Sequence, residues 1–88
     1  MPTEYRVEIL DRKTRKQLDR IRQPDFGRIA EAILRLENNP RRPGCRKLHG
    51  LEGWRMRVGD WRVIYHIDDG EHLVTVVAVR RRREDTYH

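Results

Sequence analysis

The stretch from Trp54 to Arg62, WRMRVGDWR, constrains the fold of this chain more than any other. Large apolar residues alternate with arginines on both sides of Gly59-Asp60, a pattern typical of a β-hairpin with one buried and one charged face. A two-residue turn at Gly59-Asp60 also fixes which residues lie opposite each other. The predicted pairs are Val58 with Trp61, Arg57 with Arg62, Met56 with Val63 and Arg55 with Ile64.

Arg55, Arg57 and Arg62 share one face of this predicted hairpin. Like charges that lie directly opposite each other weaken a sheet, so stability does not account for the placement. We interpret the three guanidinium groups as a binding surface for a phosphate-bearing ligand. The other face is apolar and is predicted to meet the helices, which makes its tryptophans core residues rather than base-stacking platforms. Its members are Trp54, Met56, Val58, Trp61, Val63 and Tyr65.

The composition favours a polyanionic partner. Lysine and arginine outnumber the acidic residues by 20 to 14 in 88 residues, and the net charge is +6, which suits nucleic acid, the ribosome or an acidic protein. The length predicts one domain, residues 1–88. Without a long apolar run or a signal-like N-terminus, and with a single cysteine, the chain is expected to be cytoplasmic, with no membrane partner and no disulfide. Cys45 and the scattered histidines predict neither a metal site nor a cofactor.

The N-terminal half predicts one strand and two helices. Apolar residues alternate over residues 4–10, as in a strand, and Asp11 can cap a helix that runs to about Arg22. A second helix over residues 24–38 carries a continuous apolar stripe, formed by Phe26, Ile29, Ala30, Ile33 and Leu36. Residues 41–53 are rich in Pro, Gly and basic residues and are predicted to be a loop, with a short strand near Lys47-Leu48.

The C-terminal half completes an α+β fold. Strands are predicted over residues 61–67 and 72–79, joined by a turn at residues 68–71, and the connection through two helices lets the first strand lie beside the last. The expected architecture is a mostly antiparallel four-stranded sheet, in the order β-α-α-β-β-β, with the two helices as an antiparallel pair on one face. Alternation along the last strand places Leu73, Thr75 and Val77 under the charged face and sends Arg81 to it.

The chain closes with the basic tail RRRREDTYH, residues 80–88. Its composition is equally typical of a disordered, solvated tail. The tail nevertheless leaves the sheet at the end where Arg57 and Arg62 lie, so its arginines can converge on the same site. Tyr87 could fold back over that site and stack on a base.

Taken together, these motifs resemble the RelE-type toxins of bacterial toxin–antitoxin systems, within the wider RelE/ParE group. The resemblance is sharpest in Lys47-Leu48-His49-Gly50-Leu51, in residues 54–67, in Asp69-Gly70 and in the terminal Arg/Tyr segment. It implies a compact sheet with two packed helices, and a ribosome-dependent endonuclease that cuts mRNA in the decoding site by attack of a 2′-hydroxyl on the phosphodiester.

The resemblance also implies site residues. The two basic residues before the turn fall on Arg55 and Arg57, the arginine after it on Arg62, the tail arginine on Arg82 and the near-terminal tyrosine on Tyr87. Further RNA contacts are expected from Lys47, Arg81 and Arg83. Where relatives carry lysines before the turn, this chain has arginines, and Arg80-Arg81 replaces the usual Gly followed by a basic residue or His.

Because a guanidinium group does not release its proton at accessible pH, these arginines can bind phosphate but cannot act as a base. Tyr87 is the candidate base, and His66, expected on the charged face, is the conventional alternative; His49 and His88 are not ranked. The implied partners are a cognate antitoxin, RelB-like or other, together with the ribosome and mRNA, and DNA only through the antitoxin. Two alternatives stay open: a ParE-like inhibitor of DNA gyrase, and a noncatalytic RNA- or protein-binding module of the same fold.

Overall fold

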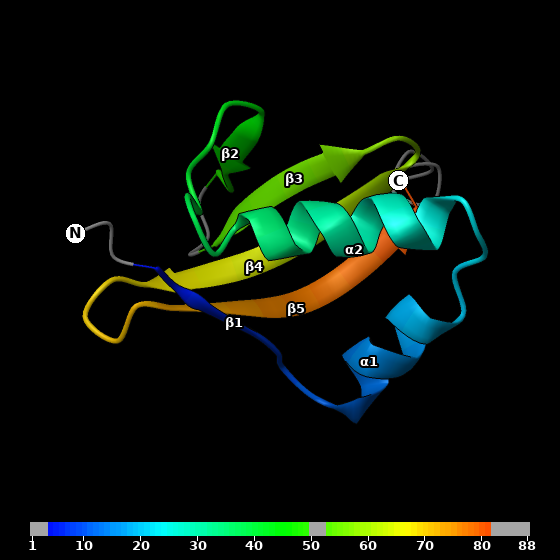
Figure 1. The fold of residues 1–88 in the computed structure, drawn as a ribbon, viewed down its shortest axis with the longest axis horizontal. Coiled ribbons are helices and arrows are strands. Elements are labelled where there is room, and N and C mark those ends of the chain that lie inside the picture. Colours follow the sequence, from blue (N-terminus) through cyan, green and yellow to red (C-terminus); the bar gives the residue numbers. More distant parts are fainter. Residues whose placement is uncertain (1–3, 50–52, 82–88) are drawn as a thin grey trace.

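The structure, a computed structural model, describes residues 4–49 and 53–81 of the chain. Within that part the chain forms five strands and two helices (Figure 1). The elements are β1 (Arg6–Ile9), α1 (Arg12–Asp19), α2 (Asp25–Arg35), β2 (Cys45–Lys47), β3 (Trp54–Val58), β4 (Trp61–Asp68) and β5 (Leu73–Arg81).

The strands form one mixed sheet in the order β1-β5-β4-β3-β2. Strand β1 pairs with β5 in parallel, and the other three pairings are antiparallel. The predicted α+β class, the mostly antiparallel sheet and the place of the first strand beside the last are therefore confirmed. The predicted count of four strands was one too low. The added strand is β2, which overlaps the short strand predicted near Lys47-Leu48 but was not counted in the predicted sheet. With only three residues it is too short for alternation to fix its bounds.

The hairpin of β3 and β4 has the predicted register. Val58 lies opposite Trp61, Arg57 opposite Arg62, and Met56 opposite Val63. Gly59 has a φ of +58°, a backbone conformation that two-residue hairpin turns require and that glycine adopts at little cost. The turn thus sets the register, and the register sets which side chains share a face.

Strand β5 contains an irregularity that the sequence did not predict. Ile64 pairs with Ala78 whereas Tyr65 pairs with Val76, so Val77 is an extra residue in the ladder. Such a bulge shifts the alternation of every residue that follows it in the strand. Val76 and Val79 are accordingly both in the core, although they are three positions apart.

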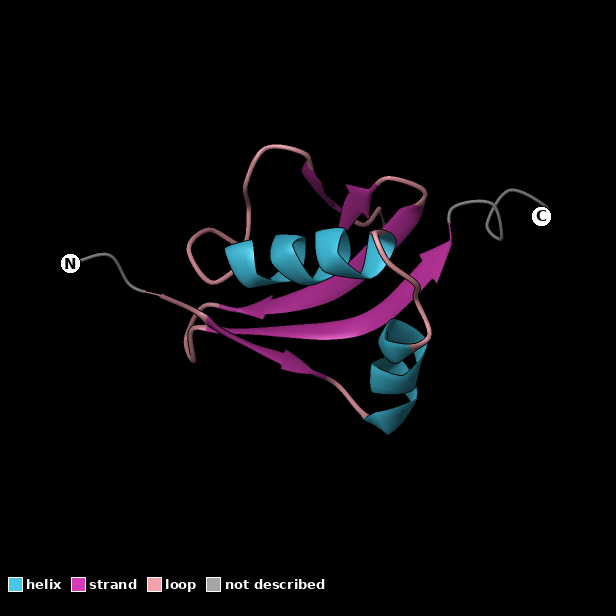
Figure 2. Cartoon of the chain, turned by 45° about the vertical axis from the view of Figure 1, so that its right-hand side comes forward, coloured by secondary structure: helices cyan, strands magenta, loops and turns pink. Residues whose placement is uncertain are grey.

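The two helices lie on the same side of the sheet but do not form the predicted antiparallel pair. Figure 2 shows α1 steeply inclined to α2, with α2 crossing the sheet and α1 beside the end of β5. Both helices are also shorter than predicted, since α1 ends at Asp19 and α2 spans Asp25–Arg35. The predicted cap of α1 is confirmed, because the side chain of Asp11 accepts a hydrogen bond from the Thr14 backbone N–H at 2.8 Å.

Helix α1 takes the position that β1 leaves open. The last pairing of β1 is Ile9 with Val76, and beyond that point the edge of β5 would lack a neighbour. There the hydroxyl of Thr14 donates to the carbonyl oxygen of Val77 at 3.2 Å, and the Val79 N–H donates to Gln17 Oε1 at 3.5 Å. Because exposed strand edges invite pairing with other chains, α1 protects this one.

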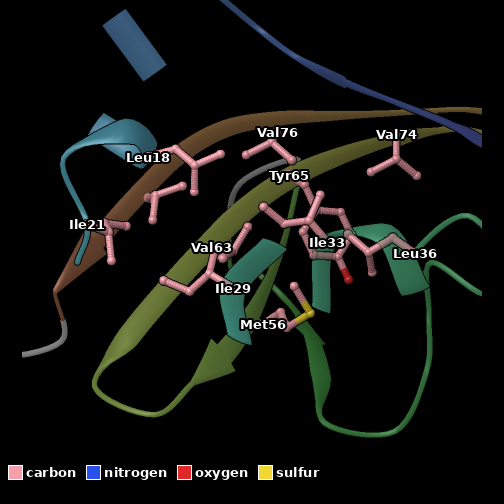
Figure 3. Close-up of a cluster of buried hydrophobic side chains, with 11 residues drawn as sticks. Leu18, Ile21, Ile29, Ile33, Leu36, Met56, Val63, Tyr65, Val74 and Val76 are labelled. Carbon is pink, nitrogen blue, oxygen red and sulfur yellow. The ribbon is translucent and has the colours of Figure 1, made fainter. Parts of the chain in front are cut away.

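The core fills the space between the helices and the sheet (Figure 3). Its fully buried side chains come from both layers, which locks α2 onto β4 and β5. They are Ile29, Leu36, Val63, Tyr65, Val74 and Val76. Trp54, Val58 and Trp61 are half-buried and pack against this cluster, so the predicted division of the hairpin into a core face and an arginine face is confirmed.

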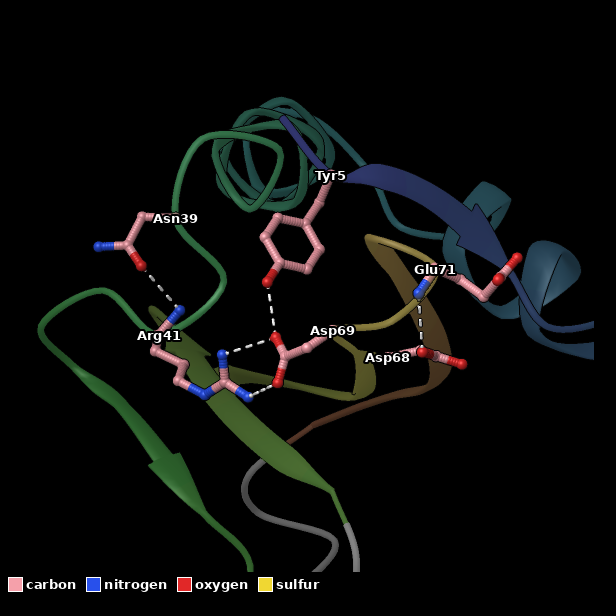
Figure 4. Close-up of polar contacts among 6 residues, drawn as sticks. All are labelled: Tyr5, Asn39, Arg41, Asp68, Asp69 and Glu71. Carbon is pink, nitrogen blue, oxygen red and sulfur yellow. Dashed lines mark hydrogen bonds and ion pairs between the residues drawn. The ribbon is translucent and has the colours of Figure 1, made fainter. Parts of the chain in front are cut away.

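The loop between α2 and β2 is anchored at two successive residues. The buried hydroxyl of Tyr65 donates to the carbonyl oxygen of Pro40 at 2.7 Å. Next, the Arg41 guanidinium binds both carboxylate oxygens of Asp69 at 3.0 and 2.8 Å and lies 5.5 Å over the Trp54 ring. The Tyr5 hydroxyl donates to the same carboxylate at 2.6 Å (Figure 4). These contacts position β2 against β3.

The Asp69 anchor predicts an acid-dependent loss of stability. Hydrogen bonds from Arg41 and Tyr5 lower the pKa of Asp69 to about 2. Since the folded-state pKa lies below the unfolded value, the stabilisation is complete above about pH 5 and is lost as the pH falls towards about 2. We expect Asp69→Asn to destabilise the protein at neutral pH, and the difference from the parent to shrink over that interval in urea titrations.

The matched control is Glu71→Gln, which removes an exposed carboxylate from the same turn without touching Arg41. Its difference from the parent should be small and should not converge with pH as that of Asp69→Asn does. A difference for Asp69→Asn that stays constant from about pH 5 to about pH 2 would contradict the assignment.

Candidate functional site

The predicted arginines of the hairpin lie on the sheet face opposite α2. Arg57, Arg62 and Arg80 form one row across β3, β4 and β5. A neighbouring row begins with Arg46 and Arg55, on β2 and β3, and continues through Ile64 and Ala78. We call the five arginines of these rows, Arg46, Arg55, Arg57, Arg62 and Arg80, the arginine face.

Two members of the arginine face, Arg46 and Arg80, were not predicted. Arg46 enters it only because β2 pairs with β3 and sets Arg46 opposite Arg55. Arg80 enters it because the bulge at Val77 shifts the alternation of β5. A sequence signal existed for Arg46 in the basic pair Arg46-Lys47 before Leu48-His49, but none marked the bulge.

The electrostatics of the arginine face favour an anion. Residues paired across neighbouring strands have Cβ atoms about 4.5–5.5 Å apart, and neither row holds an acidic residue. Arg46, Arg57 and Arg80 are exposed, whereas Arg55 and Arg62 are half-buried, and the Nε atom of Arg62 is buried. A partly desolvated guanidinium interacts more strongly with a bound phosphate than one fully in water.

Arg81, which alternation was expected to send to the charged face, lies on the helix side instead. Its guanidinium sits 5.1 Å over the ring of Trp61. The indole Nε1 of Trp61 in turn donates to Asp25 at the start of α2, at 3.1 Å. The expectation was wrong because the bulge exchanges the faces of Arg80 and Arg81.

The remaining predicted residues are more scattered. Lys47 pairs with Trp54, the first residue of β3. At this end of β3, Lys47 lines a hollow of about 210 Å³ together with Arg41 and His66. His66 is exposed on the same sheet face as Ile64, as predicted. Residues 82–88, including Arg82, Arg83, Tyr87 and His88, lie outside the described residues.

The predicted apolar floor is only partly under the arginines. Leu73, Thr75 and Val77 line a broad hollow of about 770 Å³ that also includes His66. The residues directly in the second arginine row are instead Ile64 and Ala78. The face therefore has a cationic part and an adjoining hollow of mixed character, whose lining also includes Asp68 and Asp69.

Tyr65 can be excluded as a candidate for the general base. Burial raises the pKa of the Tyr65 hydroxyl far above its usual value, and that hydroxyl already donates to Pro40. Tyr65 is therefore a structural residue rather than a base.

Among residues 4–49 and 53–81, no three His, Cys, Asp or Glu side chains gather as metal ligands would.

Comparison with known proteins identifies the family. Residues 9–86 match the sequence model described as "ParE toxin of type II toxin-antitoxin system, parDE". The chain belongs to this toxin family. The toxin is also 48% identical over 48 residues to Toxin RelE of Mycobacterium tuberculosis, a match that covers 53% of this chain and only 50% of that relative. The predicted membership of the RelE/ParE group is confirmed.

Solved structures show the same fold. The toxin is similar to a chain of the archaeal RelE-RelB complex from Pyrococcus horikoshii, with 28% identity, a TM-score of 0.78, and coverage of 90% of this chain and 96% of that one. A chain of the RelBE2 complex of M. tuberculosis is 24% identical with a TM-score of 0.79, and the match covers 93% of this chain and 95% of that one. The isolated E. coli RelE toxin is 18% identical with a TM-score of 0.76, and the match covers 88% of this chain and 83% of that one. No helix in the described part of the toxin is long and apolar enough to cross a membrane.

Proposed function

We propose that this toxin is a ribosome-dependent endoribonuclease that cleaves translated mRNA and so inhibits translation. The observation that carries the proposal is the arginine face, in which guanidinium groups from four strands share one exposed surface. A phosphodiester is the ligand that such a surface suits best. The identity with a relative named Toxin RelE supports the same reading.

The proposed reaction is attack of a 2′-hydroxyl oxygen on the adjacent phosphorus, which expels the 5′-oxygen and leaves a 2′,3′-cyclic phosphate. The reaction needs a base for the 2′ proton, cations for the charge on the phosphorane oxygens, and a proton for the leaving oxygen. Arg57 and Arg62, with Arg82 from the tail, are proposed for the second task. Arg55 holds the neighbouring phosphate, and Arg46 and Arg80 extend the same surface.

The base must come from outside the arginine face, because guanidinium groups keep their protons. Tyr87 is proposed for this role or for stacking on the base, and His66 is the alternative on the same sheet face. A site with so weak a base would act slowly on free RNA. It would gain most from a ribosome that holds the mRNA in line for attack, with Lys47, Arg81 and Arg83 as further RNA contacts.

The proposed protein partner is a cognate antitoxin. Two similar solved structures are toxin–antitoxin complexes of RelE with RelB and of RelBE2. An antitoxin that places acidic residues over the arginine face would block mRNA by charge complementarity. Contact with DNA would then arise only through the antitoxin.

Mapping of mRNA 5′ ends after induction in cells tests the proposed function. The parent toxin should produce new ends within translated codons. Arg57→Gln combined with Arg62→Gln should abolish them, because two central cations of the face are lost. A control that removes two exposed arginines elsewhere, Arg6→Gln with Arg28→Gln, should cut as the parent does. Growth arrest by the parent with intact mRNA would refute the nuclease.

A second candidate, inhibition of DNA gyrase, is favoured by the ParE description of the matching family. In the same experiment it predicts growth arrest with DNA damage and unaltered mRNA. A noncatalytic binding module predicts neither cleavage nor DNA damage from the parent.

A further inference from the structure

Helix α1 carries a second cationic surface, separate from the arginine face. Residues 11–22 include six basic and two acidic residues. Four of the cations share one side of the helix with Gln17 and line a groove of about 400 Å³. They are Arg12, Lys13, Lys16 and Arg20, called here the α1 patch. Figure 1 shows this helix at the periphery of the molecule.

The N-terminal cations of the α1 patch are arranged against the stability of their own helix, whereas Lys16 in the last turn and Arg20 at the C-cap lie where the helix dipole favours cations. Arg12 and Lys13 stand in the first turn, where the positive end of the helix dipole disfavours cations, and that turn has no acidic residue. Arg12, Lys16 and Arg20 follow one another at intervals of four, so like charges are neighbours along the helix. Among the described residues, the ion pairs join Glu31 to Arg35 and Arg41 to Asp69, so none of them involves α1.

The opposite side of α1 explains why the patch is rigid. Leu18 packs in the core and Thr14 donates to Val77 of β5 from that side, while Gln17, which also lines the groove, accepts from the Val79 N–H next to Arg80. The helix is therefore fixed on the sheet edge, and its cations form a straight array about 12 Å long. Nothing in α1 offers an aromatic ring for base stacking.

From these observations we infer that the α1 patch binds the sugar-phosphate backbone of double-helical RNA. Recognition of single strands relies on aromatic side chains that stack on bases, which α1 lacks, whereas duplex RNA presents mainly phosphates and hydroxyls on a rigid frame. The patch docks structured RNA without reading its sequence, while the arginine face takes the single-stranded substrate. This inference rests on the proposed function only in taking RNA as the partner.

The test measures binding of the purified toxin to a 20-base-pair RNA duplex by fluorescence anisotropy over a series of salt concentrations. Lys16→Gln with Arg20→Gln should lower affinity roughly tenfold or more near 0.1 M salt and reduce the salt slope by about 2, because each lost phosphate contact removes about 0.9. The control, Arg28→Gln with Arg35→Gln, removes the same charge from α2 and should change both values far less.

A stability readout separates binding from folding. Glutamine is a good helix former, and the Lys16→Gln/Arg20→Gln variant relieves repulsion between neighbouring charges. The variant also loses two cations at the C-terminal end of α1, where the helix dipole favours them, so its melting temperature should stay close to that of the parent while RNA affinity falls. A lowered melting temperature together with unchanged RNA affinity would overturn the inference.

Three further outcomes would also overturn it. Equal losses from the α1 and α2 variants would show that only net charge matters. Loss of duplex binding in Arg62→Ala, with the α1 variant unaffected, would place the duplex on the arginine face. Preferential binding of the α1 patch to an acidic helical peptide, without duplex affinity, would assign it to a protein. Because the binding assay needs no ribosome and no cleavage, its result can be interpreted even if the proposed nuclease activity is disproved.

Discussion

Replacing Arg62 with alanine should lower the rate of the proposed mRNA cleavage on programmed ribosomes by about 10²–10³-fold, the loss typical of removing one preorganised group that stabilises transition-state charge. Arg62 is the middle member of the row with Arg57 and Arg80, and its Nε atom is buried. Part of its guanidinium is therefore shielded from water before any ligand binds. Single-turnover cleavage of a stalled mRNA is the appropriate measurement.

Three companions make the Arg62 experiment specific. Arg62→Lys keeps the charge but loses the planar fork, so it should recover only part of the rate. Arg80→Ala, at the exposed end of the same row, should cost less than Arg62→Ala. Arg28→Ala on α2 should cleave as the parent does. A rate for a folded Arg62→Ala within threefold of the parent would remove Arg62 from the proposed mechanism.

Replacing Ile29 with alanine should lower the free energy of unfolding by about 2–5 kcal/mol, the usual cost of truncating a large buried aliphatic side chain. Ile29 is fully buried on α2 and packs against the sheet. For a chain of this size the loss corresponds to a fall in melting temperature of roughly 10–30 °C. Denaturation in urea and by heat gives both values.

Leu34→Ala on the same helix is the matched control. Leu34 is 58% exposed, so its truncation should change stability by no more than about 0.5 kcal/mol. Truncations of similar size should thus differ several-fold in their effect on stability at positions five residues apart. Similar losses at both positions would mean that α2 packs by a face other than the one described here.

The hairpin could be predicted residue by residue because two independent constraints agree on it. Alternation assigns each side chain to a face, and the two-residue turn at Gly59-Asp60 fixes the register. The angle between the helices could not be predicted in this way. The residues between α1 and α2 have no repeating pattern, and only the open edge of β5 explains where α1 settles.

The candidate site was predicted in part. Arg55, Arg57 and Arg62 follow directly from the hairpin, and His66 from the same alternation. Arg46 depends on the pairing of a three-residue strand with β3, a long-range contact that leaves little trace in the sequence. The exchange of Arg80 for Arg81 was missed because residues 76–79 are all apolar, so no contrast between buried and exposed positions marks the extra residue.

The bulge at Val77 makes the length of β5 a determinant of chemistry. A one-residue deletion there would restore strict pairing and exchange the two faces for everything that follows in the strand. Arg80 would then turn towards the helices and Arg81 towards solvent, with no change in the identity of either residue. Two homologues that share the same run of arginines can therefore present different ones to their ligand, and gap placement in this strand must precede any comparison of function.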